Sequence, residues 1–232
     1  MEKPGLIFDL DGTLLDSSPD LALAVNSMLR EYDLPEISHE QVSEFIGDGT
    51  PKLAERALRT AGVLQSMDDP AFDEYFDTLL IHYERNLANK TCLYPGVREV
   101  LEELTGHPMA VVTNKPSQFT RPVLEAFDLD SYFLFMAGGD RYDRKKPDPY
   151  PLLQALQALE CSPEEAVMIG DGDTDIEAGK TAGTTTVAVL YGNRSPEVLT
   201  ALNPDYTIEK FTELPAIIRS LKNSLVEDTL SK

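Results

Sequence analysis

The sequence has no tryptophan, only two cysteines and only three histidines among its 232 residues. Cys92 and Cys161 lie far apart and lack the close spacing of a zinc site or a disulfide framework, so we expect two reduced structural cysteines. The three histidines are scattered along the chain and never stand at the spacing of metal ligands. These absences argue against a disulfide-stabilised scaffold and against a zinc protein.

Basic residues are also scarce, with 20 Lys and Arg against 40 Asp and Glu and a formal net charge of −20. Nucleic acids and anionic membranes bind basic surfaces, so we expect neither as a partner. No stretch approaches the roughly 18 apolar residues of a membrane span. The apolar run near the start is too short for the core of a signal peptide. We therefore expect a cytoplasmic, globular protein.

Residues 16–90 are predicted to be helical. Apolar side chains recur there at helical spacing in separate stretches, and each stretch follows residues that typically begin a helix. These start signals are Ser18-Pro19-Asp20, Ser38 with Gln41, Thr50-Pro51 and Asp69-Pro70.

The rest of the chain alternates short apolar or β-branched strands with helices, which predicts an α/β fold with a parallel sheet covered on both faces. The strands are expected at 6–8, 109–112, 132–137, 166–169, 184–190 and 205–208, and the helices at 117–127, 150–159, 173–182 and 213–221. A polar tail from residue 223 is expected to fray. Because the helical segment follows the first strand directly, it should stand over the carboxyl edge of the sheet, where such folds bind ligands.

Three of the predicted strands end in polar residues. Asp9 follows the first strand, Thr113 follows 109–112, and Asp171 follows 166–169, with Asp175 four residues later. If these strands are neighbours, their ends converge, and carboxylates that converge repel one another unless a cation lies between them. Oxygen ligands of this kind favour Mg²⁺.

The stretch from Asp9 to Gly12 suits phosphoryl transfer. Asp9 could attack phosphorus and form a covalent intermediate, while Asp11 could protonate the leaving oxygen and later activate water. Gly12 permits a tight turn that presents backbone N–H groups to a phosphate. Thr113 could donate its hydroxyl and backbone N–H to phosphate oxygens, and Lys146 could neutralise the phosphate and the carboxylates.

Four motifs in chain order resemble those of the haloacid dehalogenase superfamily. They are Phe8-Asp9-Leu10-Asp11-Gly12-Thr13, Val112-Thr113-Asn114, Lys146-Pro147, and Gly170-Asp171 with Asp175. The resemblance covers nearly the whole chain. It implies a Rossmann-like core made of residues 1–15 and 91–232, with residues 16–90 inserted as a helical cap domain.

The resemblance also implies the site residues. Mg²⁺ would be held by the Asp9 carboxylate, the Asp11 backbone carbonyl and Asp171, with Asp175 behind them. The phosphate would be bound by Gly12, Thr113, Asn114 and Lys146, and the substrate by the cap loop Gly47-Asp48-Gly49.

Within the superfamily the chain is most similar to the bacterial phosphoglycolate phosphatases, through Leu14-Leu15-Asp16-Ser17-Ser18-Pro19-Asp20-Leu21, Tyr94-Pro95-Gly96-Val97, Val111-Val112-Thr113-Asn114-Lys115-Pro116 and Lys145-Lys146-Pro147. It departs from that group at Gly172, where Ser is frequent, and at Asp148, where His is frequent. The resemblance implies a phosphatase of a small phosphorylated metabolite, acting as a monomer or small homo-oligomer. A phosphomutase of the β-phosphoglucomutase type, or a phosphatase of another small substrate such as pyrophosphate, stays open.

Overall fold

A six-stranded parallel sheet forms the centre of the larger lobe in this computed structural model, which describes residues 3–64 and 66–221. Its order is β5-β4-β1-β6-β7-β8, and every neighbouring pair is parallel. The strands are β1 (Gly5–Phe8), β4 (Met109–Val112), β5 (Phe135–Ala137), β6 (Ala166–Gly170), β7 (Thr185–Val189) and β8 (Tyr206–Ile208). The predicted α/β fold with a parallel sheet is confirmed.

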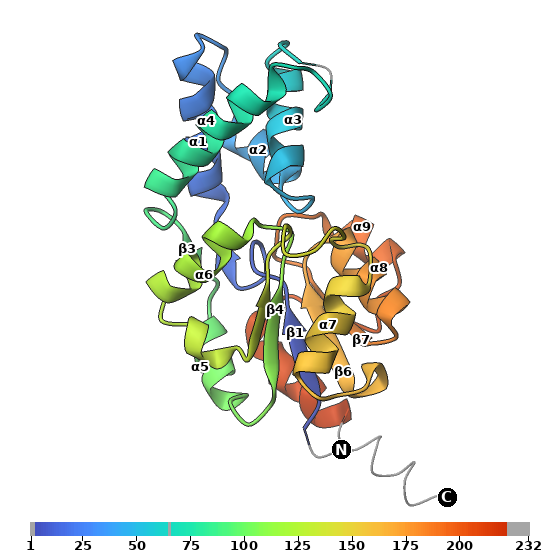
Figure 1. Ribbon diagram of the computed structural model, residues 1–232. Helices are drawn as coiled ribbons and strands as arrows, with labels where there is room; N and C mark the ends of the chain where they lie inside the picture. Colours follow the sequence, from blue (N-terminus) through green and yellow to red (C-terminus); the bar gives the residue numbers. More distant parts are fainter. Residues whose placement is uncertain (1–2, 65, 222–232) are drawn as a thin grey trace, which may run out of the picture.

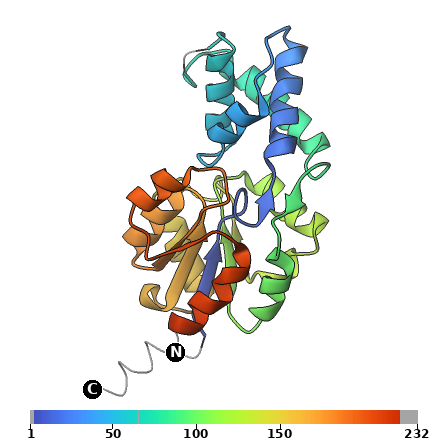
Figure 2. The same ribbon diagram turned by 180° about the vertical axis from the view of Figure 1, so that it is seen from behind.

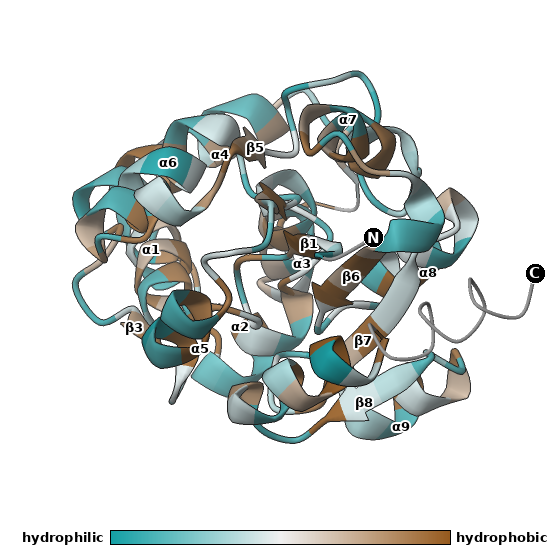
Figure 3. Ribbon diagram, turned by 90° about the horizontal axis from the view of Figure 1, so that it is seen from below, coloured by the Kyte–Doolittle hydropathy of each residue, from teal (hydrophilic) through white to brown (hydrophobic). Residues whose placement is uncertain are grey.

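Helices cover both faces of this sheet, which explains why its strands are apolar throughout rather than alternating. Leu6 and Phe8 belong to the hydrophobic cluster of one face, whereas Ile7 belongs to the cluster of the other. Figure 3 shows the hydrophobic strands β6 and β7 in the interior, with helices around them. The helices are α5 (Val97–Glu103), α6 (Ser117–Ala126), α7 (Tyr150–Ala158), α8 (Asp173–Ala182), α9 (Pro196–Ala201) and residues 214–221. Figures 1 and 2 place α7 and α5 on opposite faces.

A second, smaller lobe stands over the carboxyl edge of the sheet and consists of helices (Figure 1). They are α1 (Ser18–Glu31), α2 (His39–Phe45), α3 (Thr50–Thr60) and α4 (Phe72–Arg85). These helices have a hydrophobic cluster of their own, to which α6 contributes Phe119. We call this part the helical lobe. All four helices expected between residues 16 and 90 are present, and among the described residues no helix is long and apolar enough to cross a membrane.

The start of each lobe helix shows how the local sequence specifies it. Ser38 and Gln41 form the predicted capping box of α2. Ser18 was expected to cap α1, but the helix already begins at Ser18 and Ser17 occupies the cap position. The Ser17 hydroxyl does not cap the helix, because it donates to Asp11. Asp69 forms a turn ahead of α4, so this helix begins at Phe72.

The chain passes between the two lobes twice, and a short ribbon joins these passages. Its strands are β2 (Leu15–Asp16) and β3 (Cys92–Leu93), which pair antiparallel. One carboxylate oxygen of Asp20 also accepts hydrogen bonds from Lys90 N, Thr91 N and Thr91 Oγ1, each at 2.8 Å. The two passages are thereby fixed to each other.

Some elements differ from those expected. The strand predicted at 132–137 is limited to Phe135–Ala137, because Asp130–Tyr132 forms a turn of 3-10 helix. Helices α5 and α9 were not predicted, since seven and six residues are too few to show a clear helical period. The predicted last helix is present from residue 214 to 221, and the tail predicted from 223 lies outside the described residues.

Candidate active site

The carboxyl ends of β1, β4 and β6 meet at one edge, beneath the helical lobe. Phe8 pairs with Val111 and with Ile169, so the residues that follow these strands lie side by side. One carboxylate oxygen each from Asp9, Asp171 and Asp175 lies within 4.8 Å of the others. The structure therefore brings together the acidic residues that the sequence placed at strand ends.

Lys146 is the buried cation of this cluster. Its Nζ lies 2.9 Å from Asp9 Oδ1 and 2.5 Å from Asp175 Oδ1, and it donates to Val112 O at 2.7 Å. Burial alone would lower the pKa of Lys146, but the carboxylates of Asp175 and Asp9 raise it above the usual value, so the ammonium keeps its charge. Lys145, by contrast, is exposed and donates to Asp48 O.

One lysine does not balance three buried carboxylates. Burial and the charge of Asp9 raise the pKa of both Asp171 and Asp175. Apart from its ion pair with Lys146, Asp9 Oδ1 is buried and accepts no hydrogen bond from the described residues. Three converging buried carboxylates with a single lysine between them leave negative charge uncompensated, which fits a site for a cation that prefers oxygen ligands, such as Mg²⁺.

Asp171 and Asp175 are also oriented by their neighbours. Asp171 accepts hydrogen bonds from Thr13 Oγ1 at 2.9 Å and from Asn193 N at 2.8 Å. Asp175 lies at the start of α8 and accepts from Gly172 N at 2.9 Å. Each carboxylate is thus fixed before any ligand arrives.

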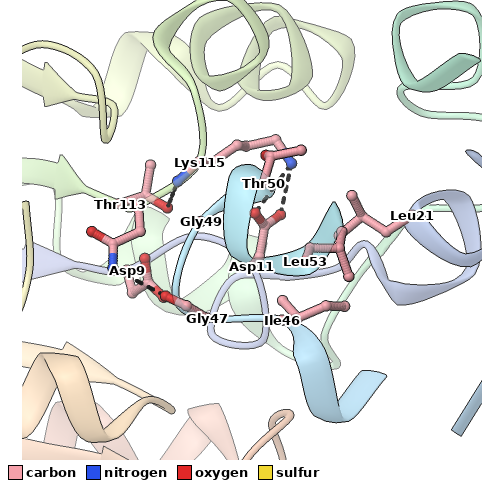
Figure 4. Close-up of a pocket in the computed structure, with 11 residues that line it drawn as sticks. Asp9, Asp11, Leu21, Ile46, Gly47, Gly49, Thr50, Leu53, Thr113 and Lys115 are labelled. Atoms are coloured by element: carbon pink, nitrogen blue, oxygen red, sulfur yellow. Dashed lines mark hydrogen bonds and ion pairs between the residues drawn. The ribbon is translucent and has the colours of Figure 1, made fainter. Parts of the chain in front are cut away.

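Asp11 faces away from this cluster, toward a second buried lysine that the sequence analysis did not assign. Lys115 Nζ donates to Asp11 Oδ1 at 3.0 Å and to Oδ2 at 3.1 Å (Figure 4), and it also contacts the Tyr83 hydroxyl of α4. Ser17 Oγ donates to Asp11 Oδ1 at 2.6 Å. Burial alone would lower the pKa of Lys115, but Asp11 and Tyr83 raise it above the usual value. The expected acid–base residue is therefore held by a cation and a hydroxyl.

Gly12 occupies the tight turn that was predicted, with φ of 93°. A Cβ at this position would lie 2.1 Å from Asp171 Oδ2, so only glycine allows the turn to approach Asp171. The N–H of Gly12 itself donates to Leu15 O at 2.8 Å, so this donor is already used within the turn.

Thr113 and Asn114 were predicted to bind a phosphate, but some of their hydrogen-bonding atoms already have partners within the protein. The Thr113 N–H donates to Ala137 O at 2.9 Å within the sheet, so the predicted donation of this N–H to a phosphate is wrong. Its hydroxyl oxygen accepts from Lys115 N at 3.2 Å, which leaves the hydroxyl hydrogen for a ligand. Asn114 Nδ2 donates to Gly47 O and to Lys146 O, each at 3.0 Å, so this side chain joins two loops.

The loop of Gly47, Asp48 and Gly49 connects the helical lobe to the site. Both glycines have positive φ and line the cavity above Asp9. Asp48 does not contact that cavity, because its carboxylate is paired with Arg56 at 2.5 Å and with Arg194 at 3.2 Å. The structure thus assigns Asp48 a role in holding the loop rather than the predicted contact with a substrate.

The cavity between the lobes is small and contains about 30 Å³ of space for water-sized molecules. That is room for roughly two waters. The lining residues are Asp9, Asp11, Leu21, Ile46, Gly47, Gly49, Thr50, Leu53, Thr113, Asn114 and Lys115 (Figure 4). The acidic cluster at the sheet edge thus opens onto a narrow space roofed by the helical lobe.

This arrangement of three strand-end motifs and a buried loop lysine beneath an inserted helical lobe matches a known family. Residues 6–189 match the model described as haloacid dehalogenase-like hydrolase. The chain belongs to this family. The predicted resemblance is confirmed, and the fold class agrees with that of solved relatives.

Curated relatives are similar to the chain over nearly its full length. A phosphoglycolate phosphatase of Haemophilus influenzae is 40% identical over 218 residues, covering 91% of this chain and 96% of the relative. One of Aquifex aeolicus is 37% identical over 224 residues, covering 96% and 98%. The crystal structure of a predicted phosphoglycolate phosphatase from Haemophilus somnus superposes with a TM-score of 0.86 at 34% identity, covering 94% of this chain and 98% of that one. The expectation of a phosphatase-like hydrolase is confirmed.

Proposed function

We propose that this hydrolase removes phosphate from a small phosphate monoester, 2-phosphoglycolate, through a phospho-Asp9 intermediate. The observation that carries the proposal is the convergence of Asp9, Asp171 and Asp175 around Lys146 at the mouth of a narrow cavity. The names of the curated relatives support the substrate. Residues 16–90 would act as the cap and residues 1–15 and 91–232 as the core.

Asp9 is the nucleophile in this proposal. Its carboxylate lines the cavity and is held by Lys146 at 2.9 Å, so that it faces an incoming phosphorus atom as an anion. The Thr113 hydroxyl lines the same cavity and would donate to a phosphate oxygen.

Asp11 is the general acid and base. It lines the cavity beside Asp9, where it would protonate the leaving oxygen and later take a proton from the attacking water. The Ser17 hydroxyl orients its carboxylate.

Magnesium would be held by the carboxylates of Asp9 and Asp171 and the backbone carbonyl of Asp11, with Asp175 behind them. When bound, Mg²⁺ would supply the positive charge that offsets these carboxylates and the phosphate. Lys146 cannot do this alone, because it is already shared between Asp9 and Asp175.

The lining of the cavity favours a small acid over a sugar bisphosphate. Leu21, Ile46 and Leu53 line its lobe side and offer no hydrogen bonds to the hydroxyls of a sugar ring. The phosphomutase alternative is therefore less compatible with this site.

The test is phosphate release from 2-phosphoglycolate, pyrophosphate and β-glucose 1-phosphate, each with Mg²⁺ and with a chelator. We expect Mg²⁺-dependent release with 2-phosphoglycolate strongly preferred. Equal, slow release from all substrates would contradict the substrate. Conversion of β-glucose 1-phosphate to its 6-phosphate isomer without phosphate release would contradict the phosphatase.

A further inference from the structure

Lys115 is a buried cation that lines the cavity and is paired with Asp11. Its side chain is 1% exposed, and among the described residues that line this cavity it is the one with a positive charge. Lys146 is engaged with Asp9 and Asp175 below. A substrate that carries a negative charge besides its phosphate would therefore meet Lys115.

The position of the Lys115 ammonium is set from both lobes. Asp11 holds it from the motif after β1, and the Tyr83 hydroxyl holds it from α4. The Tyr83 ring is itself fixed edge-on against Phe119, with centroids 4.9 Å apart. The cation thus stands at the junction of the lobes, beside the residue expected to face the leaving oxygen.

Asp11 does not depend on Lys115 alone for its orientation. Ser17 Oγ donates to Asp11 Oδ1 at 2.6 Å, a hydrogen bond that persists if the ammonium turns to another anion. An exchange of partners at Lys115 would therefore leave the Asp11 carboxylate in place.

The lobe-side wall of the cavity is apolar around this cation. Leu21, Ile46 and Leu53 line it, and all three are buried. An apolar wall with a single cation suits a short ligand with one further negative charge, because a hydroxyl-rich ligand would lose its hydrogen bonds to water there.

Together, these contacts identify a feature of the substrate that the proposed function leaves open. We propose that Lys115 pairs with a substrate carboxylate two bonds from the ester oxygen, so that the site selects 2-phosphorylated carboxylic acids over neutral esters of equal size. Lys115 contacts Asp11, and the proposed mechanism places Asp11 beside the leaving oxygen. A carboxylate two bonds from that oxygen would therefore reach the Lys115 ammonium. This inference rests on the proposed phosphatase activity.

A cycle of substrate and protein changes tests it. The kcat/KM for 2-phosphoglycolate and for its neutral amide, 2-phosphoglycolamide, is measured with wild type, Lys115→Met and Lys115→Arg at saturating Mg²⁺. We expect wild type to prefer the acid by about 100-fold, as for a desolvated charge pair. Lys115→Met should reduce that preference below about 3-fold, mainly through the KM of the acid, and Lys115→Arg should retain more of it.

Lys180→Met is the control, because this exposed lysine donates only to Leu202 O on the far side of α8. Its preference should equal that of wild type. Circular dichroism and the melting temperature show, independently of activity, that each variant is folded. If Lys115→Met does not fold, the inference is judged on the other two proteins. Wild type must prefer the acid over the amide, and Lys115→Arg must retain part of that preference.

Two results would overturn this inference and leave the phosphatase intact. One is a wild type that hydrolyses acid and amide equally well. The other is an equal loss of both activities in Lys115→Met, which would mean that Lys115 acts only through Asp11. Absence of Mg²⁺-dependent release from every phosphate ester by wild type would instead overturn the proposed function itself.

Discussion

The two walls of the cavity are built in different ways. On the sheet side Asp9 lines the cavity, and Lys146, Asp171 and Asp175 are buried beside it; we call this group the sheet-side wall. Lys146 forms short ion pairs with Asp9 and with Asp175. The lobe-side wall consists of loop glycines and apolar helix side chains. The chemical groups are thus fixed by the sheet, whereas the groups that enclose the substrate depend on how the helical lobe sits.

The contacts that hold the loop of Gly47, Asp48 and Gly49 over the site are polar. Asn114 donates to Gly47 O, Lys145 donates to Asp48 O at 2.7 Å, and Arg194 joins Asp48 to Asp173. Partly exposed contacts of this kind contribute little each. Because the enclosed space is too small for a phosphorylated acid, we expect these contacts to break and reform as substrate enters.

The largest effect is expected at Asp9, at the centre of the sheet-side wall. Asp9→Asn should lower kcat by at least about 10⁴-fold because the amide cannot attack phosphorus. Circular dichroism should show an unchanged fold. Asp33→Asn is the matched control, since Asp33 lies in a lobe turn with φ of 55°, which asparagine tolerates. Wild-type turnover by Asp9→Asn would contradict the mechanism.

The neighbouring residues Lys145 and Lys146 allow the contributions of the two walls to the free energy of unfolding to be compared. Lys146→Met leaves two buried carboxylates without their cation and should lower the free energy of unfolding by about 3 kcal/mol. Lys145→Met removes one exposed hydrogen bond to a carbonyl and should cost under about 1 kcal/mol. Urea unfolding measures both. Equal losses would show that the two walls do not differ as described.

Metal binding should depend on the sheet-side wall alone. Saturating Mg²⁺ should raise the melting temperature of wild type by about 5 °C, because it binds the folded site. Asp171→Asn should abolish most of that rise, whereas Asp173→Asn, two residues away and partly exposed, should retain it. Thermal unfolding with Mg²⁺ or chelator tests this, and an undiminished rise in Asp171→Asn would remove it from the metal site.

The smallest effect is expected on the lobe side, at Asp48. Burial alone would raise the pKa of Asp48, but Arg56 and Arg194 hold it below 3.8. Since the folded value is the lower one, the stabilisation is present above pH 3.8 and disappears as the pH falls through the folded pKa. Asp48→Asn should therefore be less stable than wild type by about 1 kcal/mol at pH 7, with the difference shrinking in acid. Urea unfolding across pH measures it, and a difference that grows in acid would contradict the pairing.

The sheet-side wall could be predicted from the sequence because polar residues directly follow apolar strands. Asp9, Thr113 and Asp171 each stand at such a point, and the sheet order makes their strands neighbours. The partner of the Thr113 N–H was predicted wrongly. This partner, Ala137 O, lies on β5, and the bounds of β5 depend on the 3-10 turn before it.

The polar contacts that join the two lobes could not be predicted from the sequence. Lys115 follows Asn114 in a polar turn, where a lysine is ordinarily exposed. Its burial results from Tyr83, 32 residues earlier in the chain, and from Asp11, 104 residues earlier. Likewise, Asp48 is held away from the cavity by Arg56 on α3 and by Arg194, which lies 146 residues later in the chain. Single residues brought together by tertiary packing leave no local pattern.

The central claim is that Asp9 carries the phosphoryl group, and trapping that intermediate tests it most directly. Enzyme quenched during turnover of 2-phosphoglycolate with Mg²⁺ is reduced with borohydride, which converts an acyl phosphate of aspartate to homoserine. Mass spectrometry should then find homoserine at position 9 and unmodified aspartate at Asp11, Asp171 and Asp175. Homoserine at another position, or an enzyme that turns over rapidly while Asp9 stays unmodified throughout, would contradict the account.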